Sequence, residues 1–184
     1  MNQHDMTRNM VLAALFAALT AIGAFLQIPT GTVPITLQFL FTALAGLLLG
    51  WKWGAISQLL YVGIGLLGLP VFTQGGGIGY VLQPRFGFLL GLIPAAAVIG
   101  ALTARRTGYL TVLAAVLVGD LILYAVGVPY MYLILHVYMQ SAKTFPALLA
   151  AMLVYVPGDT LKIIVVTALA PVLRRTLAKA VPNL

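Results

Sequence analysis

Apolar runs long enough to cross a bilayer recur along the whole of this sequence. The run at 10–28, for example, contains no charged residue. A helix needs about 20 predominantly apolar residues to span the hydrocarbon of a membrane. Only 7% of the residues are charged, against about 25% in an ordinary soluble domain, so the expected surroundings are lipid rather than water. The runs therefore predict an all-α, polytopic integral membrane protein.

Prolines, glycines and basic residues divide the apolar sequence into six predicted membrane-spanning helices. The expected spans are 10–28, 36–49, 55–69, 86–102, 109–126 and 146–173. A tight turn at 51–54 separates the second span from the third. Within the longer connection 127–145, the segment 130–139 is predicted to form a short helix lying in the interface. Six spans occupy the 184 residues, so we expect a single six-helix transmembrane domain over 1–184.

Basic residues gather at one end of the predicted spans. That end carries Arg8, Lys52, Arg105, Arg106, Arg174, Arg175 and Lys179, whereas Arg85 and Lys143 lie at the other. Loops rich in Lys and Arg stay in the cytoplasm. We therefore expect a protein of the cell membrane with both termini cytoplasmic and the loops 29–35, 70–85 and 127–145 outside. The same rule accounts for the net charge of +7 without nucleic acid as a partner.

The first run also shares features with a signal peptide, since Arg8 precedes it and the stretch 21–24 contains small residues. The apolar part of a signal peptide measures about 7–15 residues, and this run is longer. We therefore expect it to remain in the protein as the first span.

The inventory of reactive side chains is small. The chain has no cysteine and no glutamate, three aspartates and two histidines. This composition excludes disulfides, thiolate metal sites and a cysteine nucleophile, and a carboxylate-rich metal site is not expected. The sequence offers no His dyad and no Ser–His pair at a plausible site. We predict no metal, no cofactor and no enzymatic activity.

The last predicted span contains two ionisable residues at a depth where lipid is expected. Asp159 and Lys162 are three residues apart, so they share a helix face and can pair. Each costs about 2.5–3.5 kcal/mol to insert at the centre of a span. Pro157 and Gly158 come directly before them and break the helix, which is tolerated only inside protein or beside a cavity. We interpret the pair as a polar binding site inside the bundle; a purely structural ion pair is the alternative.

The loop 70–85 is the second candidate region. Gly77 and Gly79 belong to its glycine-rich centre and allow the backbone to approach a ligand; an ordinary flexible loop is the alternative. Arg85, at the start of the fourth span, suits an anionic group, and the alternative is an arginine whose head reaches the interface.

Three polar residues in other spans complete the candidates. Gln38 and Tyr124 stand near the outer ends of their spans and can hydrogen-bond either a ligand or a neighbouring helix. Asp120, in the fifth span, has no role that the sequence assigns.

Small residues repeat along one side of the first span. Ala13 and Ala17 are four residues apart, and Ala14 and Ala18 run beside them. Rows of small residues let helices approach closely. The row therefore predicts either packing within the monomer or docking to a partner subunit.

Five stretches of the chain together resemble one known family. They are 34–38, 75–80, 87–91, 124–127 and 157–162, and the glycine loop combined with the Pro-x-Asp-x-x-Lys run is the most specific part. On these stretches the chain resembles the biotin-specific substrate-binding (S) components of energy-coupling factor transporters, the BioY family. The resemblance extends over nearly the whole chain and implies the six-helix bundle of an S component.

The resemblance also implies a ligand and partners. Biotin would lie in a pocket near the external face together with Asp159 and Lys162. The chemistry of biotin is compatible with this pocket: Asp159 can accept from a ureido N–H, Lys162 can donate to the ureido oxygen or to the carboxylate, and Arg85 can neutralise the carboxylate. Tyr80 and Tyr61 would cover the ring. The alanine row of the first span would contact a transmembrane coupling (T) subunit, and two cytoplasmic ATPase subunits would drive import.

Other functions stay open at this point. An S component for thiamine or riboflavin would share the fold. The chain contains no ATP-binding motif, so a stand-alone facilitative biotin transporter is another alternative. A passive structural or channel-forming protein is a third, although it would not need a buried Asp–Lys pair beside a broken helix.

Overall fold

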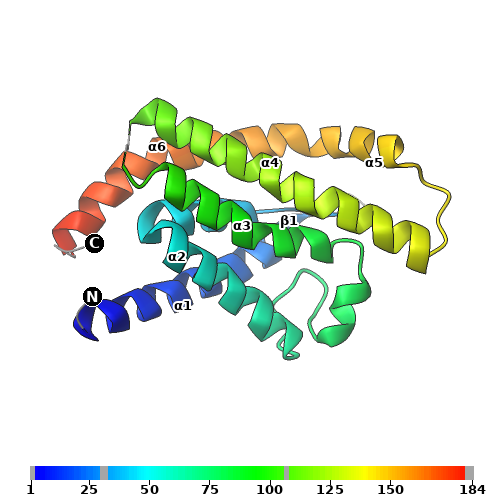
Figure 1. The fold of residues 1–184 in the computed structure, drawn as a ribbon, viewed down its shortest axis with the longest axis horizontal. Helices are drawn as coiled ribbons and strands as arrows, with labels where there is room; N and C mark the ends of the chain where they lie inside the picture. The colour runs from blue at the N-terminus through cyan, green and yellow to red at the C-terminus, as the bar shows by residue number, and fades with distance from the viewer. Residues whose placement is uncertain (1–2, 30–32, 106–107, 181–184) are drawn as a thin grey trace.

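The computed structural model is a bundle of helices with one two-stranded ribbon (Figure 1), and it describes residues 3–29, 33–105 and 108–180. Arg106 lies outside these ranges. The helices are α1 (Gln3–Phe25), α2 (Gln38–Leu66), α3 (Phe86–Leu102), α4 (Tyr109–Leu133), α5 (Phe145–Met152) and α6 (Val156–Ala180). Strands β1 (Gln27–Ile28) and β2 (Ile35–Thr36) pair antiparallel. Short helical turns are η1 (Ile78–Leu82), the π-helical η2 (Ile134–Tyr138) and η3 (Leu153–Tyr155).

Four helical segments are long and apolar enough to cross a membrane. They are Asp5–Phe25, Gln38–Leu66, Tyr109–Tyr138 and Phe145–Thr176, and α3 is a shorter apolar helix. The helical, membrane-spanning character predicted from the sequence is confirmed, and the bounds of α3 are those predicted for the fourth span. The number of spans depends on how the chain runs inside α2.

The chain reverses direction within α2 at Gly50. The backbone of Gly50 has φ 77° and ψ 179°, a conformation that glycine adopts without steric cost. On either side of the bend, Thr42 Oγ1 lies 2.9 Å from Gln58 Oε1 and Gln38 Nε2 lies 2.8 Å from the Tyr61 hydroxyl. Residues at similar distances along the chain from Gly50 therefore face each other, and the two arms form a helical hairpin. The tight turn predicted at 51–54 is found one residue earlier, at Gly50, and 51–54 are helical, because a single glycine suffices to turn the chain.

Very close helix contacts hold α3 between α2 and α4 (Figure 1). A Cβ added at Gly46 would collide with the backbone of Ala96, and one added at Gly100 would collide with the backbone of Trp51. On the other side, Gly91 lies against Leu123 of α4. Small residues allow this approach of backbones in membrane bundles. Glycine therefore sets the spacing of the three helices that form one wall of the cavity described below.

The α4 helix continues beyond its predicted end. The sequence predicted a span ending at residue 126 and a separate interfacial helix at 130–139, but α4 extends to Leu133 and passes into η2. Pro129 lies inside the helix and removes only one backbone donor. Within lipid a continuous helix satisfies the remaining backbone groups, and buried contacts with α5 support the extension. The two predicted segments are therefore one helix.

The final helical segment contains a short 3-10 turn just before Pro157, where the sequence predicted a kink or break. The short α5 ends at Met152, the turn η3 follows, and α6 starts immediately before Pro157. The backbone stays helical through η3 into α6, and Phe145–Thr176 forms one long apolar helical segment. Asp159 lies in the first turn of α6.

The alanine row of α1 divides between two environments. Ala13 and Ala17 have exposed fractions of 0% and 4% and belong to the apolar core. Ala14 and Ala18 are exposed. Adjacent positions are rotated by about 100° around a helix, so one pair packs inside the monomer while the other faces outward. Packing within the monomer thus accounts for Ala13 and Ala17.

Candidate functional site

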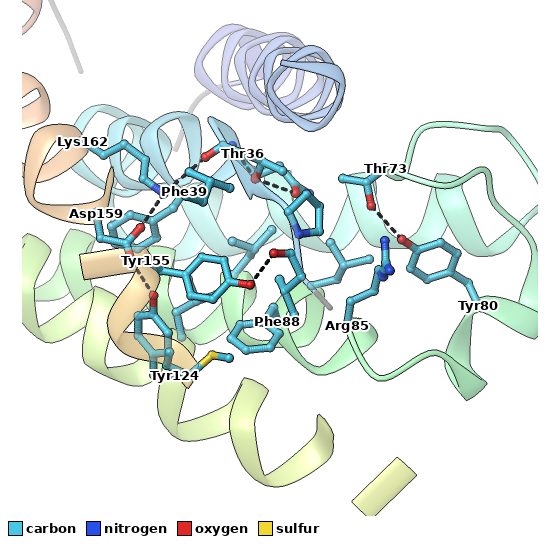
Figure 2. A pocket seen from close by; sticks show the side chains of 18 residues that line it. Thr36, Phe39, Thr73, Tyr80, Arg85, Phe88, Tyr124, Tyr155, Asp159 and Lys162 are labelled. Carbon is cyan, nitrogen blue, oxygen red and sulfur yellow. Dashed lines mark hydrogen bonds and ion pairs between the residues drawn. The ribbon is translucent and has the colours of Figure 1, made fainter. Parts of the chain in front are cut away.

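A cavity lies where the start of α2, the ribbon, α3, α4 and α6 meet (Figure 2). The residues that line it are Val33, Pro34, Ile35, Thr36, Gln38, Phe39, Thr73, Tyr80, Arg85, Phe88, Leu89, Leu92, Leu123, Tyr124, Met152, Tyr155, Asp159 and Lys162. They come from segments that are distant in sequence. The cavity combines polar groups at its two ends with apolar walls between them.

One end of the cavity is an ion-paired network. Lys162 Nζ lies 2.5 Å from Asp159 Oδ1, and both residues are less than a tenth exposed. The Tyr124 hydroxyl donates a hydrogen bond to Asp159 Oδ2. Lys162 also donates to the backbone oxygen of Thr36 in β2, at 3.3 Å. The pair is therefore buried and compensated, and it joins α6 to α4 and to the ribbon.

The opposite end presents a cation. Arg85 stands directly before α3, and its Nε atom is buried without a hydrogen-bond partner among the described residues. Nearby, the hydroxyls of Thr73 and Tyr80 lie 3.0 Å apart. Figure 2 shows Arg85, Thr73 and Tyr80 together on one side of the cavity, away from Asp159 and Lys162. Arg85 is half-buried, and a guanidinium with an unfilled donor is suited to bind a carboxylate.

The space between these ends is apolar and partly aromatic. Phe88 packs edge-on against Tyr124, with ring centroids 6.0 Å apart at 87°. Tyr155 closes another side and donates a hydrogen bond of 2.5 Å to the backbone oxygen of Val33. Leu89, Leu92 and Met152 complete the wall. Such a wall removes the apolar body of a small ligand from water.

The arrangement suits binding rather than catalysis. One polar end offers a carboxylate acceptor and an ammonium donor, and the other offers a guanidinium. No group of three or more His, Cys, Asp or Glu that could hold a metal ion occurs in the part of the chain that is described. A fitting ligand is therefore a small molecule with a neutral hydrogen-bonding head, an apolar body and an anionic tail.

Most residues singled out from the sequence meet at this cavity. Asp159, Lys162, Arg85, Gln38, Tyr80 and Tyr124 all line it. The side chain of Gln38 is already engaged, because it donates to Tyr61 and accepts from the Thr36 hydroxyl at 2.9 Å. Its contact with a ligand would therefore require a rearrangement of these bonds.

Three of the residues predicted to contact a ligand do not line the cavity. Gly77 and Gly79 do not line the cavity. Instead Gly77, at φ 100°, donates its N–H to the Gly65 oxygen at 2.7 Å and thereby fixes the loop against α2. Tyr61 is 1% exposed, donates to the Val71 oxygen and does not reach the cavity. The glycine loop therefore positions Tyr80 rather than the ligand.

Several lining residues were not identified from the sequence as ligand contacts. Phe88, Met152 and Tyr155 are apolar or aromatic residues in apolar surroundings, so nothing in their spacing distinguishes them from lipid-facing positions. Val33 and Ile35 enter the site through the ribbon, which is too short to leave a strand pattern. The one available signal was proximity to the motif residues, since Tyr155 precedes Pro157 and Phe88 follows Gly87.

Comparison with known proteins gives a consistent result. The sequence profile of the BioY family matches residues 1–179. A probable biotin transporter BioY of Lysinibacillus sphaericus is 52% identical over 147 residues, covering 79% of this chain and 75% of the relative. The biotin transporter BioY of Rhodobacter capsulatus is 39% identical over 188 residues, with 97% of each chain covered.

A solved structure is similar in fold as well. The crystal structure of the S-component for biotin from an ECF-type ABC transporter superposes with a TM-score of 0.84, at 30% sequence identity, and the match covers 95% of each chain.

Proposed function

The chain belongs to the BioY family, and from this premise we propose that its cavity binds biotin for import across the cell membrane. The family is one of transporters rather than enzymes. The protein is accordingly a biotin-binding subunit of a membrane transporter. The observation that supports this function best is the placing of Asp159 and Lys162 at one end of the cavity and Arg85 at the other (Figure 2).

The two ends match the two polar groups of biotin. The ureido ring carries N–H donors and a carbonyl acceptor. Asp159 can accept from a ureido N–H while Lys162 donates to the ureido oxygen, since both side chains line the cavity. The carboxylate of the tail then faces Arg85, and the apolar walls take the bicyclic body and the alkyl chain. Each hydrogen bond that involves a charged group is stronger than a neutral one.

The proposal includes a topology of six spans in one domain. The two arms of α2 on either side of Gly50 would count as separate spans, which together with α1, α3, α4 and the segment α5–α6 makes six. Support comes from the hydrogen bonds between the arms and from the beginning of α1 and the end of α6, which lie at the same end of the molecule (Figure 1). Basic residues concentrate at that end, so both termini would be cytoplasmic.

The proposal also includes partners. The solved relative is an S-component of an ECF-type ABC transporter. We therefore infer a T subunit and two cytoplasmic ATPase subunits as partners of this chain. Ala14 and Ala18 are the exposed small residues of α1 and are suited to close contact with a helix of the T subunit.

Equilibrium binding to the purified chain in detergent tests the ligand. We expect saturable, one-site binding of biotin, and no binding of thiamine or riboflavin at the same concentrations, because neither offers a ureido ring and a carboxylate at opposite ends. Binding of another vitamin alone would move the function to a different S component. A monodisperse protein that binds none of the three would contradict the proposal.

Replacing Arg85 by glutamine tests the orientation of the ligand. We expect the affinity for biotin to fall by about 10- to 100-fold, since hydrogen bonds to charged groups contribute about 1.5–3 kcal/mol. Biotin methyl ester, whose tail is neutral, should bind the variant as it binds the unmodified protein. The measurement is a titration of both ligands.

The matched control for this variant is Lys143→Gln, which removes an exposed cation from the loop before α5. It should leave both affinities unchanged. An equal loss for the acid and the ester in Arg85→Gln would show that Arg85 does not face the carboxylate.

A further inference from the structure

One half-buried acidic residue has no function in the site as described. Asp120 belongs to α4, one helical turn before Tyr124. It does not line the cavity, and its Oδ1 atom is buried without a hydrogen-bond partner in the described part of the chain. An ionisable side chain within a membrane span is costly, and so is an unsatisfied buried polar atom. The position therefore calls for a role.

The packing of α4 against α6 places Asp120 near Lys162. The two helices run antiparallel (Figure 1), and Tyr124 touches Asp159. One turn back along α4 and one turn forward along α6 bring Asp120 to the level of Ile163, next to Lys162. Asp120 accordingly interacts electrostatically with both Asp159 and Lys162.

In the described structure, both a donor of Lys162 and an acceptor of Asp120 lack a hydrogen-bond partner. Lys162 has three donors, of which one meets Asp159 and one meets the Thr36 oxygen in the described structure. Asp159 has one oxygen on Lys162 and the other on Tyr124. The cluster thus contains one ammonium and two carboxylates. The free oxygen of Asp120 is a second place where the ammonium of Lys162 can bind.

We propose that Asp120 is a positioning residue for the ureido end of the site. When a ligand N–H donates a hydrogen bond to Asp159, Asp120 forms an ion pair with the ammonium group of Lys162. This inference rests on the proposed function. In the empty protein the Asp159–Lys162 pair is closed on itself. A ligand that uses Asp159 as an acceptor weakens this pair, and a buried charge that loses its partner is strongly unfavourable. A second carboxylate near Lys162 lowers that penalty.

The variant Asp120→Asn tests the proposal, because it keeps the size of the side chain and removes its charge. We expect the affinity for biotin to fall by about 10-fold or more, with biotin methyl ester affected equally since the change acts at the ureido end. Asp120→Glu should recover part of the lost affinity. The control is Asp5→Asn, the same substitution in the outlying Asp5–Arg8 pair of α1, which should bind biotin normally.

Two further readouts separate positioning from a structural role. In a Lys162→Met background, Asp120→Asn should cause no additional loss, because there is no ammonium to hold; the same loss in both backgrounds would overturn the proposal. Independently, infrared difference spectra of protein labelled with ¹³C-aspartate should change on addition of biotin. In Asp5→Asn, where only Asp120 and Asp159 remain, two carboxylates should respond.

The infrared spectra distinguish a positioning role of Asp120 from a structural role even if the Lys162→Met protein binds biotin too weakly to measure or Asp120→Asn does not fold. A response from one carboxylate alone would exclude the proposed change of the ion-pair partner of Lys162 from Asp159 to Asp120. Failure of the proposed function would be distinguished by its own result, since the unmodified protein would then not bind biotin at all.

Discussion

Replacement of Lys162 by methionine is expected to lower the affinity for biotin by about 10- to 100-fold and also to destabilise the fold. The variant removes the charged donor to the ureido oxygen, and a hydrogen bond of this kind contributes about 1.5–3 kcal/mol. It also leaves Asp159, which is 6% exposed, as a buried carboxylate without its cation, which costs about 3–5 kcal/mol of folding stability. The measurements are biotin titration and thermal unfolding in detergent.

A double replacement separates binding from stability at this position. Lys162→Met combined with Asp159→Leu removes both charges, and the exchange of a buried ion pair for apolar residues is often neutral for stability. We expect the double variant to regain thermal stability that the single variant loses, while biotin binding stays weakened. The control is Lys52→Met, at an exposed lysine near the α2 bend.

The single variant also decides between the two interpretations of the pair. If Lys162→Met bound biotin with unchanged affinity, the ion pair would be structural only and the ligand would bind elsewhere.

Replacement of Gly100 by valine is expected to destabilise the fold strongly. A Cβ at Gly100 would overlap backbone atoms of Trp51 and Gly50, and backbone cannot move aside as the end of a side chain can. Overpacking in a well-packed interior typically costs about 1–3 kcal/mol, occasionally more, and here the displaced atoms form the bend of α2. We expect a loss of about 3 kcal/mol or more, seen as a large fall in the melting temperature and in the yield of monodisperse protein.

Gly63→Val provides the matched control for this change. Gly63 lies in the second arm of α2, and a Cβ added there would meet no atom within 4 Å. The substitution is the same, but the space is open, so the melting temperature should change little. If both valine variants unfolded alike, the close contact of α3 with the α2 bend would not be what stabilises this region.

The polar part of the site was accessible from the sequence for a physical reason. A charged residue inside an apolar run is so unfavourable that it signals a special environment. Asp159 and Lys162 were found in this way, and their helical spacing predicted the pair that the structure contains. Arg85 was recognised because it begins a span rather than lying within one. The helical bounds of α3 were also predictable, since proline and basic residues flank that run.

The apolar part of the site was not accessible in the same way. In a membrane protein, residues that face lipid and residues that face a cavity have the same chemistry. Phe88 and Tyr155 therefore carry no mark that distinguishes them from aromatic residues on the outside of the bundle. The same ambiguity applies to α1, where sequence spacing could not decide that Ala13 packs inward and Ala14 faces outward.

By itself, the sequence determined that the chain is helical and lies in a membrane, that it contains an Asp–Lys pair directly after a proline and a glycine, and that it resembles a family of transporters. These properties depend on local composition and spacing, which the order of residues specifies directly. Only the tertiary structure decided where the chain reverses at Gly50, that Tyr80 lines the cavity while Gly77 and Gly79 do not, and that Arg85 faces the ion pair across one cavity. Those properties depend on contacts between segments that are far apart in sequence. Such contacts are set by how closely the backbones approach and by how each helix is rotated about its axis. The spacing of residues in an almost uniformly apolar chain does not determine either of these.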